Sequence, residues 1–429
     1  MAESGTDTVM LRRLRDWLKY EAKDRVKSLY NPLVIALAGQ WRRRLGGTVC
    51  IGITGSAGKT TTKDLLYTVL ASQYPSTRND DSNNQLYNIA RTLLASSRRT
   101  RYVVQELGAS KPGTFDAMVG LLRPSVALLT NVNTDHFSAF RSREAVAAEN
   151  GKLVACLPAD GLAILNADDD LVRAMAADCR ARVVTYGLHA AADFRGRICS
   201  GGWPERLALE CDYPGGTVTV RTRLLGDHLA PNVLAVLATA ITLGIEPERA
   251  AQALGELEAP FQRLSVHPTV GGIDILRDDF KSPAWSLPMV LQFLSNARTP
   301  GRRVLVLGTV SDTANRPDRV YAKLVDRAPE CVDLLLLVGH RHRPLQQRIR
   351  NAQGRVLCIP DVREAAQWLR AELRAGDLLL LKGSGADHLG RLVLHLDREV
   401  RCWRSVCGRH IACDHCALLG VASEPSSHG

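Results

Sequence analysis

Short apolar runs alternate with segments of helical periodicity from Thr48 onward. These runs are too short for helices, so they predict buried strands. In the first half of the chain the predicted strands are Thr48–Thr54, Tyr102–Leu107, Val126–Asn131, Gly161–Asn166 and Arg182–Tyr186. Apolar residues at helical spacing predict helices at Thr60–Ser72 and Pro231–Leu243. Residues 194–225 hold short β-like runs separated by glycine turns, which favours an antiparallel insertion.

The alternation begins again near residue 262. The predicted strands there are Arg303–Leu307, Leu334–Val338, Arg355–Ile359 and Leu378–Leu381, with a helix at Val362–Arg374. Strands that alternate with helices are typical of an α/β fold, in which a mostly parallel sheet carries helices on both faces. We expect a helical extension (1–46), a central domain (47–260), a C-terminal Rossmann-like domain (261–400) and a tail (401–429).

Residues 1–46 carry a basic, amphipathic pattern. Apolar residues recur near helical spacing up to Leu29, Asn31-Pro32 interrupts the pattern, and Leu33–Leu45 predicts a second helix. A packing helix or a dimer contact is the favoured interpretation. Docking to an anionic membrane surface is less favoured, because the basic residues do not lie on one clean face.

Composition narrows the function classes. The chain of 429 residues has a net charge of +11, which comes mainly from short arginine runs. Aromatic residues make up only 5% and are not interleaved with those runs, so we expect no nucleic-acid partner. No apolar run reaches the roughly 18 residues of a spanning helix, and the N-terminus lacks a signal-peptide pattern. A cytoplasmic location without stable membrane insertion follows, and the eleven cysteines fit it if most are reduced.

The segment Thr54–Thr61, with the sequence TGSAGKTT, follows a predicted strand and opens a predicted helix. This is the setting of a phosphate-binding loop, although Ile53 stands where a strict Walker A motif has glycine. Backbone N–H groups and the helix N-terminus would bind phosphate oxygens, Lys59 would reach the terminal phosphates of ATP, and Thr60 would hold Mg²⁺. The predicted nucleotide-binding residues here are Gly55, Ser56, Ala57, Gly58, Lys59, Thr60 and Thr61.

The motifs that follow this loop, taken in order, resemble the Mur ligase superfamily, which includes the muramyl-peptide ligases and folylpolyglutamate synthase. They are VQELGA (104–109), the segment from Arg123-Pro124 through TNVNTDHF (130–137), and LNADD (165–169). The similarity is closest to the ligases that add D-alanyl-D-alanine. It implies that Glu106 and His136 hold Mg²⁺ together with Thr60, and that they act in catalysis beside Lys59.

Further motifs extend the resemblance to about residue 395. The segment from Gly226-Asp227-His228 onward is similar to a family helix start, which implies that Asn232 binds adenine. Arg263 lies at the expected domain junction and is implied as a ligand of the nucleotide phosphates. In RDDFKSP (277–283), Asp279 is the implied ribose ligand and Lys281 a catalytic partner of the phosphates. Gly376–Ser384 is similar to the family's "GD…KGS" strand end.

The chain also departs from the family pattern in the central domain. Asn150 stands where relatives carry a carbamylated lysine, and Lys152 is out of register. An asparagine oxygen can coordinate Mg²⁺ but carries no charge, so the second metal should bind weakly. Tyr87 and Ile89 replace the glycine and proline expected after the Asn83-Asn84 substrate-loop motif.

Two more departures concern the substrates. The family's N-terminal nucleotide-sugar domain is missing ahead of the phosphate loop, so we do not expect a peptidoglycan precursor as the acid. Lys382-Gly383-Ser384 is followed by Gly385–His388 in place of the usual arginine, which argues against the dipeptide as the amine.

Cysteine and histidine crowd the tail. Cys413 and Cys416 form a C-x₂-C pair of the kind that binds zinc, and Cys402 and Cys407, with His410 nearby, could complete the ligand set. The pattern fits a structural zinc site and a cysteine-bearing tail without metal equally well.

Together the motifs predict an ADP-forming ligase that uses ATP and Mg²⁺ to join a small-molecule carboxylate to an amine or amino acid through an acyl-phosphate. The alternative is a P-loop nucleotide-binding switch or a Mur-like scaffold that has lost catalysis, which Asn150 and the altered loops would suit. The sequence indicates no oligomeric state.

Overall fold

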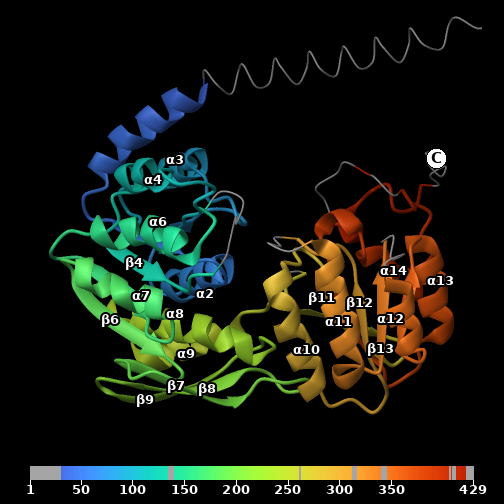
Figure 1. Ribbon diagram of the computed structural model, residues 1–429. Coiled ribbons are helices and arrows are strands. Elements are labelled where there is room, and N and C mark those ends of the chain that lie inside the picture. Colours follow the sequence, from blue (N-terminus) through green and yellow to red (C-terminus); the bar gives the residue numbers. More distant parts are fainter. Residues whose placement is uncertain are drawn as a thin grey trace, which may run out of the picture. The chain divides into compact units, whose positions relative to one another are not determined.

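The computed structural model describes residues 30–133, 140–259, 262–311, 316–339, 345–404, 407 and 412–421. The chain divides into two compact units. The first comprises the described residues up to Val132 together with Glu144–Thr185, and the second comprises Asn133–Arg143 and the chain from Tyr186 onward (Figure 1). Within the described parts, no helix is both long enough and apolar enough to cross a membrane.

The first unit is built on parallel strands in the order β2-β3-β1-β4-β5-β6. These strands are β1 (Val49–Thr54), β2 (Ser76–Arg78), β3 (Tyr102–Glu106), β4 (Val126–Leu129), β5 (Leu162–Asn166) and β6 (Arg182–Gly187). The helices are α2 (Lys59–Ala71), α3 (Leu86–Ala95), α4 (Phe115–Leu122), α6 (Arg143–Ala155) and α7 (Asp170–Ala174). Strand β1 is central and pairs in parallel with β3 and β4. Because parallel strands end at the same edge, the segments after these three strands meet there.

Residues 30–44 form one helix that includes Asn31 and Pro32, where the sequence predicts a break. Val34 and Ala38 are buried. The Trp41 indole donates to the carbonyl oxygen of Ser96 at 3.0 Å, and Arg42 donates to that of Leu122 at 2.7 Å. The segment is therefore a packing helix of the first unit. The amphipathic pattern up to Leu29 lies outside the described residues.

The second unit begins with the expected antiparallel insertion. Strands β7 (Phe194–Ser200), β8 (Ala208–Tyr213) and β9 (Gly216–Arg221) pair in antiparallel fashion and follow β6 in the strand order. The helices α8 (Ala230–Thr242) and α9 (Pro247–Glu256) come next. The residues of α8 are almost all buried, as its apolar sequence predicts.

A six-stranded sheet follows in the order β10-β11-β15-β12-β13-β14. Its strands are β10 (Ser265–Val270), β11 (Ile273–Asp278), β12 (Arg303–Leu307), β13 (Leu334–Val338), β14 (Val356–Ile359) and β15 (Leu378–Lys382). Its helices are α10 (Leu287–Asn296), α11 (Pro317–Cys331), α12 (Gln346–Asn351), α13 (Val362–Glu372) and α14 (Gly390–Asp397). All pairings are parallel except that of β10 with β11.

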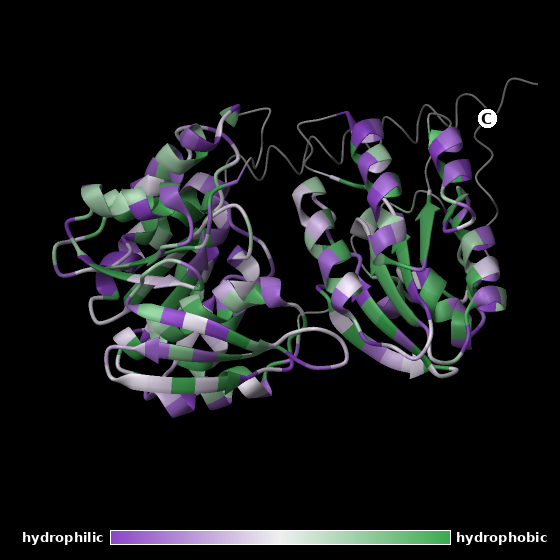
Figure 2. Cartoon of the chain, turned by 60° about the horizontal axis from the view of Figure 1, so that its bottom comes forward, coloured by the Kyte–Doolittle hydropathy of each residue, from purple (hydrophilic) through white to green (hydrophobic). Residues whose placement is uncertain are grey.

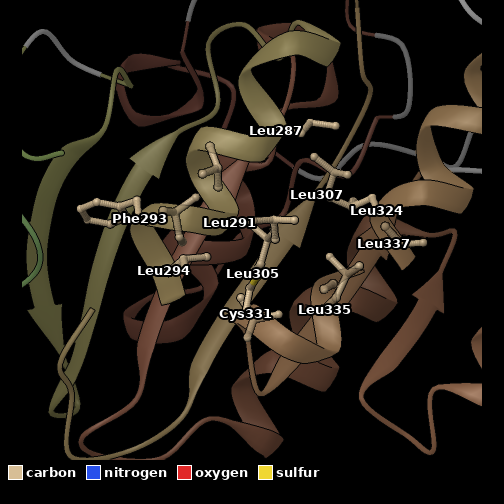
Figure 3. Close-up of a cluster of buried hydrophobic side chains, with 14 of the residues drawn as sticks. Leu287, Leu291, Phe293, Leu294, Leu305, Leu307, Leu324, Cys331, Leu335 and Leu337 are labelled. Carbon is tan, nitrogen blue, oxygen red and sulfur yellow. The ribbon is translucent and has the colours of Figure 1, made fainter. Parts of the chain in front are cut away.

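Alternate residues of these buried strands face opposite cores. Leu305 and Leu307 pack with α10 and α11, whereas Val304 and Val306 pack with α13 and α14. Figure 3 shows the first cluster, with Leu291 and Leu294 of α10 beside Leu305. Figure 2 shows the central strands of the six-stranded sheet as apolar bands and the helices around them as mixed. A strand that is buried on both faces is apolar throughout, which is why the sequence locates these strands so closely. The α/β prediction is confirmed.

Candidate active site

The loop after β1 has the conformation of a phosphate-binding loop. Gly55 has φ 138° and Gly58 has φ 78°, values that favour glycine. A Cβ at Gly55 would lie 2.1 Å from the Thr130 hydroxyl, so no other residue fits there. Gly58 is also the N-cap of α2 and has no side chain to cap the first turn. The glycine-rich turn that the sequence predicts is therefore present at the start of α2, and its binding of phosphate stays a prediction.

Residues after β4 hold this loop in shape. The backbone N–H of Ser56 donates to the carbonyl oxygen of Asn131 at 2.9 Å, and that of Ala57 donates to the Asn131 side-chain oxygen at 2.9 Å. The Thr130 hydroxyl donates to the carbonyl oxygen of Ala57 at 2.7 Å. The Lys59 ammonium donates to the carbonyl oxygen of Gly55 at 2.5 Å, which places this cation over the loop. The two motifs therefore form one structure.

Glu106, the last residue of β3, lies beside the start of α2. Its Oε2 accepts a hydrogen bond from Thr60 Oγ1 at 2.8 Å, and its Oε1 accepts one from Asn84 Nδ2 at 3.0 Å. The side chain is 1% exposed. The structure thus brings together two of the three predicted Mg²⁺ ligands, Thr60 and Glu106. Their hydroxyl and carboxylate oxygens are the donors that a hard cation prefers. The third, His136, lies outside the described residues.

Asn84 follows a loop, residues 79–83, that is held by side-chain hydrogen bonds. Lys63, fully buried on α2, donates to the carbonyl oxygens of Asn79 at 2.9 Å and Asp81 at 2.6 Å. The Asn79 side chain accepts from the Glu106 backbone N–H at 2.9 Å and donates to the Asn83 carbonyl oxygen at 3.0 Å. Sequence reasoning missed Asn79 and Lys63. The only signal was that Lys63 follows Lys59 by one helical turn.

Asn150 lies next to the end of β1. Its Oδ1 accepts from the Thr54 hydroxyl at 3.1 Å, and the residue is buried. Lys152 instead pairs with Asp116 at 2.7 Å and Glu149 at 3.0 Å. Two residues along a helix rotate a side chain by about 200°. Asn150, and not Lys152, therefore contacts the end of β1, and its match to the carbamate position stays a prediction.

Glu149 is a structural carboxylate. It accepts from the backbone N–H groups of Gly113 at 3.0 Å and Phe115 at 2.8 Å, and it pairs with Lys152. Burial raises its pKa, but the two N–H donors and the lysine outweigh burial and hold the pKa below its ordinary value. Glu149 thus anchors the start of α4 as an anion.

In the second unit, the predicted ribose segment ends β11. Asp279 is 1% exposed, and its oxygens accept from Arg277 Nε at 2.7 Å, Arg277 Nη2 at 2.8 Å and Gln262 Nε2 at 3.1 Å. Asp278 pairs with Lys382, the last residue of β15, at 2.8 Å. A carboxylate accepts about four hydrogen bonds, so Asp279 retains one acceptor position. Arg277 and Gln262 carried no sequence signal for this role.

Arg263 lies near the same segment, with its guanidinium 4.7 Å from the centre of the Phe280 ring. The residues on either side of it have left-handed backbone, with φ 60° at Gln262 and 52° at Leu264. Such conformations are uncommon for non-glycine residues and concentrate at functional sites. Asn232 lies in the first turn of α8 and is mostly buried. Lys281 follows Phe280, and its carbonyl oxygen accepts from Lys382 at 2.8 Å.

His228 precedes α8. Burial, assisted by the nearby Lys382 ammonium, lowers its pKa to about 4, so this imidazole is neutral at physiological pH. A neutral imidazole can donate one hydrogen bond and accept another.

The tail cysteines are partly buried free thiols. Cys413 Sγ lies 3.4 Å from His388 Nδ1, and burial raises the pKa of Cys413 to about 11. Among the residues that the structure describes, no three histidine, cysteine or acidic side chains form a group able to hold a metal ion. His410 lies outside those residues. The predicted zinc ligands Cys402, Cys407, Cys413 and Cys416 are all described and are not gathered into such a group, so the structure does not support the zinc site.

Comparison with known proteins places these features in a family. A family model described as the Mur ligase middle domain matches residues 53–240, and one described as the Mur ligase, glutamate ligase domain matches residues 262–385. The UDP-N-acetylmuramoyl-tripeptide–D-alanyl-D-alanine ligase of Mycobacterium tuberculosis (strain CDC 1551 / Oshkosh) is 30% identical over 382 residues, which cover 83% of this chain and 74% of that enzyme. The enzyme of the same name from Bacillus subtilis is 27% identical over 353 residues, 82% of this chain and 76% of the relative.

A crystal structure of MurF from Acinetobacter baumannii shares the fold, with a TM-score of 0.78 at 22% identity over 85% of this chain and 80% of the other. The phosphate loop with its adjoining carboxylate, the two α/β units and these matches define an ATP-dependent, ADP-forming ligase that makes an amide bond. The chain belongs to the Mur ligase family.

Proposed function

We propose that this ligase activates a small-molecule carboxylic acid as an acyl-phosphate and transfers the acyl group to an amine. A carboxylate oxygen attacks the γ-phosphorus of ATP, and the bond to the ADP oxygen breaks. The amine nitrogen then attacks the acyl carbon, the bond to phosphate breaks, and the nitrogen loses a proton. The products are the amide, ADP and phosphate.

The contact of Thr60 with Glu106 carries this proposal. A buried carboxylate beside the hydroxyl of a phosphate loop offers oxygen ligands that suit a cation bound together with ATP. Mg²⁺ held by Thr60 and Glu106 would supply positive charge to the phosphate oxygens. Lys59 and the first turn of α2 would stabilise the charge that develops on the transferring phosphoryl group.

The second unit supplies the groups that we assign to the rest of the nucleotide. Asp279, with one acceptor position left, is proposed to bind a ribose hydroxyl, and Asn232 the adenine. Arg263 and Lys281 are proposed to contact the phosphates. These residues lie at or beyond the carboxyl ends of parallel strands or at a helix start, where α/β proteins bind ligands.

We propose that the amine site differs from the family pattern, because Lys382-Gly383-Ser384 is not followed by the expected arginine. Ser384–Asp387 forms a capped turn, in which Asp387 accepts from the Thr309 backbone N–H at 2.7 Å and from its hydroxyl at 2.6 Å. The position of the expected arginine is thus filled by an acidic, self-capped turn. We propose an amine other than D-alanyl-D-alanine, and the substrates named for the relatives serve as the reference pair.

ADP release tests the ligase against a nucleotide switch. ADP formation should rise sharply only when an acid and an amine are both present, and it should track amide formation one to one. Screening starts from the relatives' muramoyl tripeptide and D-alanyl-D-alanine and extends to other carboxylates and amino acids. Turnover of ATP that no acid or amine stimulates would contradict the proposed function and favour the switch.

A further inference from the structure

The tail beyond α14 is held to the second unit by buried polar contacts. Arg391, 2% exposed, donates to the carbonyl oxygens of Cys402 at 3.1 Å and Arg404 at 3.0 Å. Farther along, Cys413 contacts His388. The match to the family's glutamate ligase domain ends at residue 385, so this tail lies outside the matched domain.

Docking brings Asp414 to the buried guanidinium of Arg277. Arg277 Nη1 donates to Asp414 Oδ1 at 3.1 Å, and Nη2 lies 3.5 Å from Oδ2. The other edge of the same guanidinium donates to both oxygens of Asp279. One arginine that is 1% exposed therefore joins a carboxylate of the tail to the proposed ribose ligand.

The packing leaves this arrangement little freedom. A Cβ at Gly390 would lie 2.6 Å from Arg277 Nη2 and 3.1 Å from Asp414 Oδ2, so glycine is needed where the two charges meet over α14. A buried guanidinium is costly unless it is paired, and pairing on two edges fixes the plane of the group. Asp414 thus contacts the edge of the Arg277 guanidinium that carries Nη1.

We propose that Asp414 is a positioning residue for nucleotide binding. It fixes Arg277, and Arg277 in turn holds Asp279 with its remaining acceptor position directed toward a ribose hydroxyl. This inference rests on the proposed function, in which Asp279 contacts the ribose. Because three acceptor positions of Asp279 are already used, a small rotation of Arg277 would redirect the fourth.

The test measures binding of Mg·ADP and of Mg·2′-deoxy-ADP and Mg·3′-deoxy-ADP to the full-length chain by calorimetry. Asp414→Asn keeps the shape of the side chain and removes its charge. We expect it to weaken ADP binding about three- to tenfold, the range for residues coupled in one ion-pair network, and to weaken binding of a deoxy nucleotide less. Glu399→Gln, an exposed acid of the tail paired with Arg401, is the control and should leave binding unchanged.

A double-mutant cycle separates positioning from folding. In an Asp279→Asn background, Asp414→Asn should cause no further loss. The conservative change Asp414→Glu, made alone, should retain ribose discrimination. The inference is overturned if ADP and both deoxy nucleotides lose equally, if the two substitutions add, or if only the melting temperature changes. Failure of the wild-type chain to bind Mg·ADP would instead overturn the proposed function, and this inference with it.

Discussion

Replacing Glu106 by glutamine separates the charge of this side chain from its packing. The amide oxygen of glutamine can still accept one hydrogen bond, and the Thr60 hydroxyl can reverse to accept one from the new amide N–H. At most one of the two hydrogen bonds of this side chain, to Asn84 or to Thr60, therefore has to rearrange. We therefore expect the free energy of unfolding without ligand to change by no more than about 1 kcal/mol, the net worth of one hydrogen bond.

Catalysis should respond far more strongly. Removing one group that acts on the charge of the transition state costs about 10²–10³-fold in turnover, or roughly 2.7–4 kcal/mol. Ligand binding should respond as well. Nucleotide at 100 times its Kd stabilises a protein by about 2.7 kcal/mol, and a site that has lost its carboxylate should lose most of the Mg²⁺-dependent part of this gain.

The assay combines ADP release with thermal unfolding in the presence and absence of Mg·ADP. Asp160→Asn, at an exposed acid of the same unit, is the matched control and should behave as the wild type. Turnover of Glu106→Gln within threefold of the wild type would refute a metal-binding role. A large loss of stability without ligand would show instead that the carboxylate serves the fold.

Three further changes test other parts of the site. Lys59→Ala should lower turnover by about 10²–10³-fold, because the transferring phosphoryl group loses a positioned cation; near-wild-type ligation would contradict the phosphate-loop assignment. Since Asn150 cannot form a carbamate, bicarbonate should not stimulate ligation and full rate should need high free Mg²⁺; stimulation by bicarbonate at low Mg²⁺ would mean that a lysine is carbamylated. The pKa of Glu149 is lowered in the fold, so its contribution to stability is present above the ordinary carboxyl pKa of 4.5 and is lost as pH falls through the folded value. Glu149→Gln should therefore lower the melting temperature at pH 7 and have a smaller effect near pH 3, and an equal effect at both pH values would argue against this.

The sequence predicts buried parallel strands well, because a strand buried on both faces is a continuous apolar run. The bounds of β12 and β13 agree with the prediction at both ends. The hairpin of β10 and β11 gave no comparable signal. Pro268 and exposed positions interrupt the apolar pattern of β10, and β11 ends in charged residues. Its pairing depends on the glycine turn at 271–272 and on β15, about a hundred residues later, which local pattern cannot reveal.

The same division applies to the site. The phosphate loop and Glu106 could be predicted because a strand, a glycine turn and a helix start fix their positions locally, and a strand-end acid next to a central strand must come to the same edge. Asp279 could be identified only as one of two neighbouring acids. Its environment is set by Arg277 and by Gln262 from another segment, and those contacts follow from the sheet register and not from the residue type.

The Arg277 contacts also show why a motif does not define a site by itself. The predicted ribose acid is buried and mostly satisfied, so its value to a ligand depends on the one acceptor position that its neighbours leave open. One of those neighbours, Arg277, is paired in turn with Asp414, 137 residues farther along the chain. Residues that match a family motif can thus be held by residues that do not. The predicted ribose segment is therefore held in part by a tail that lies beyond the matched family domain.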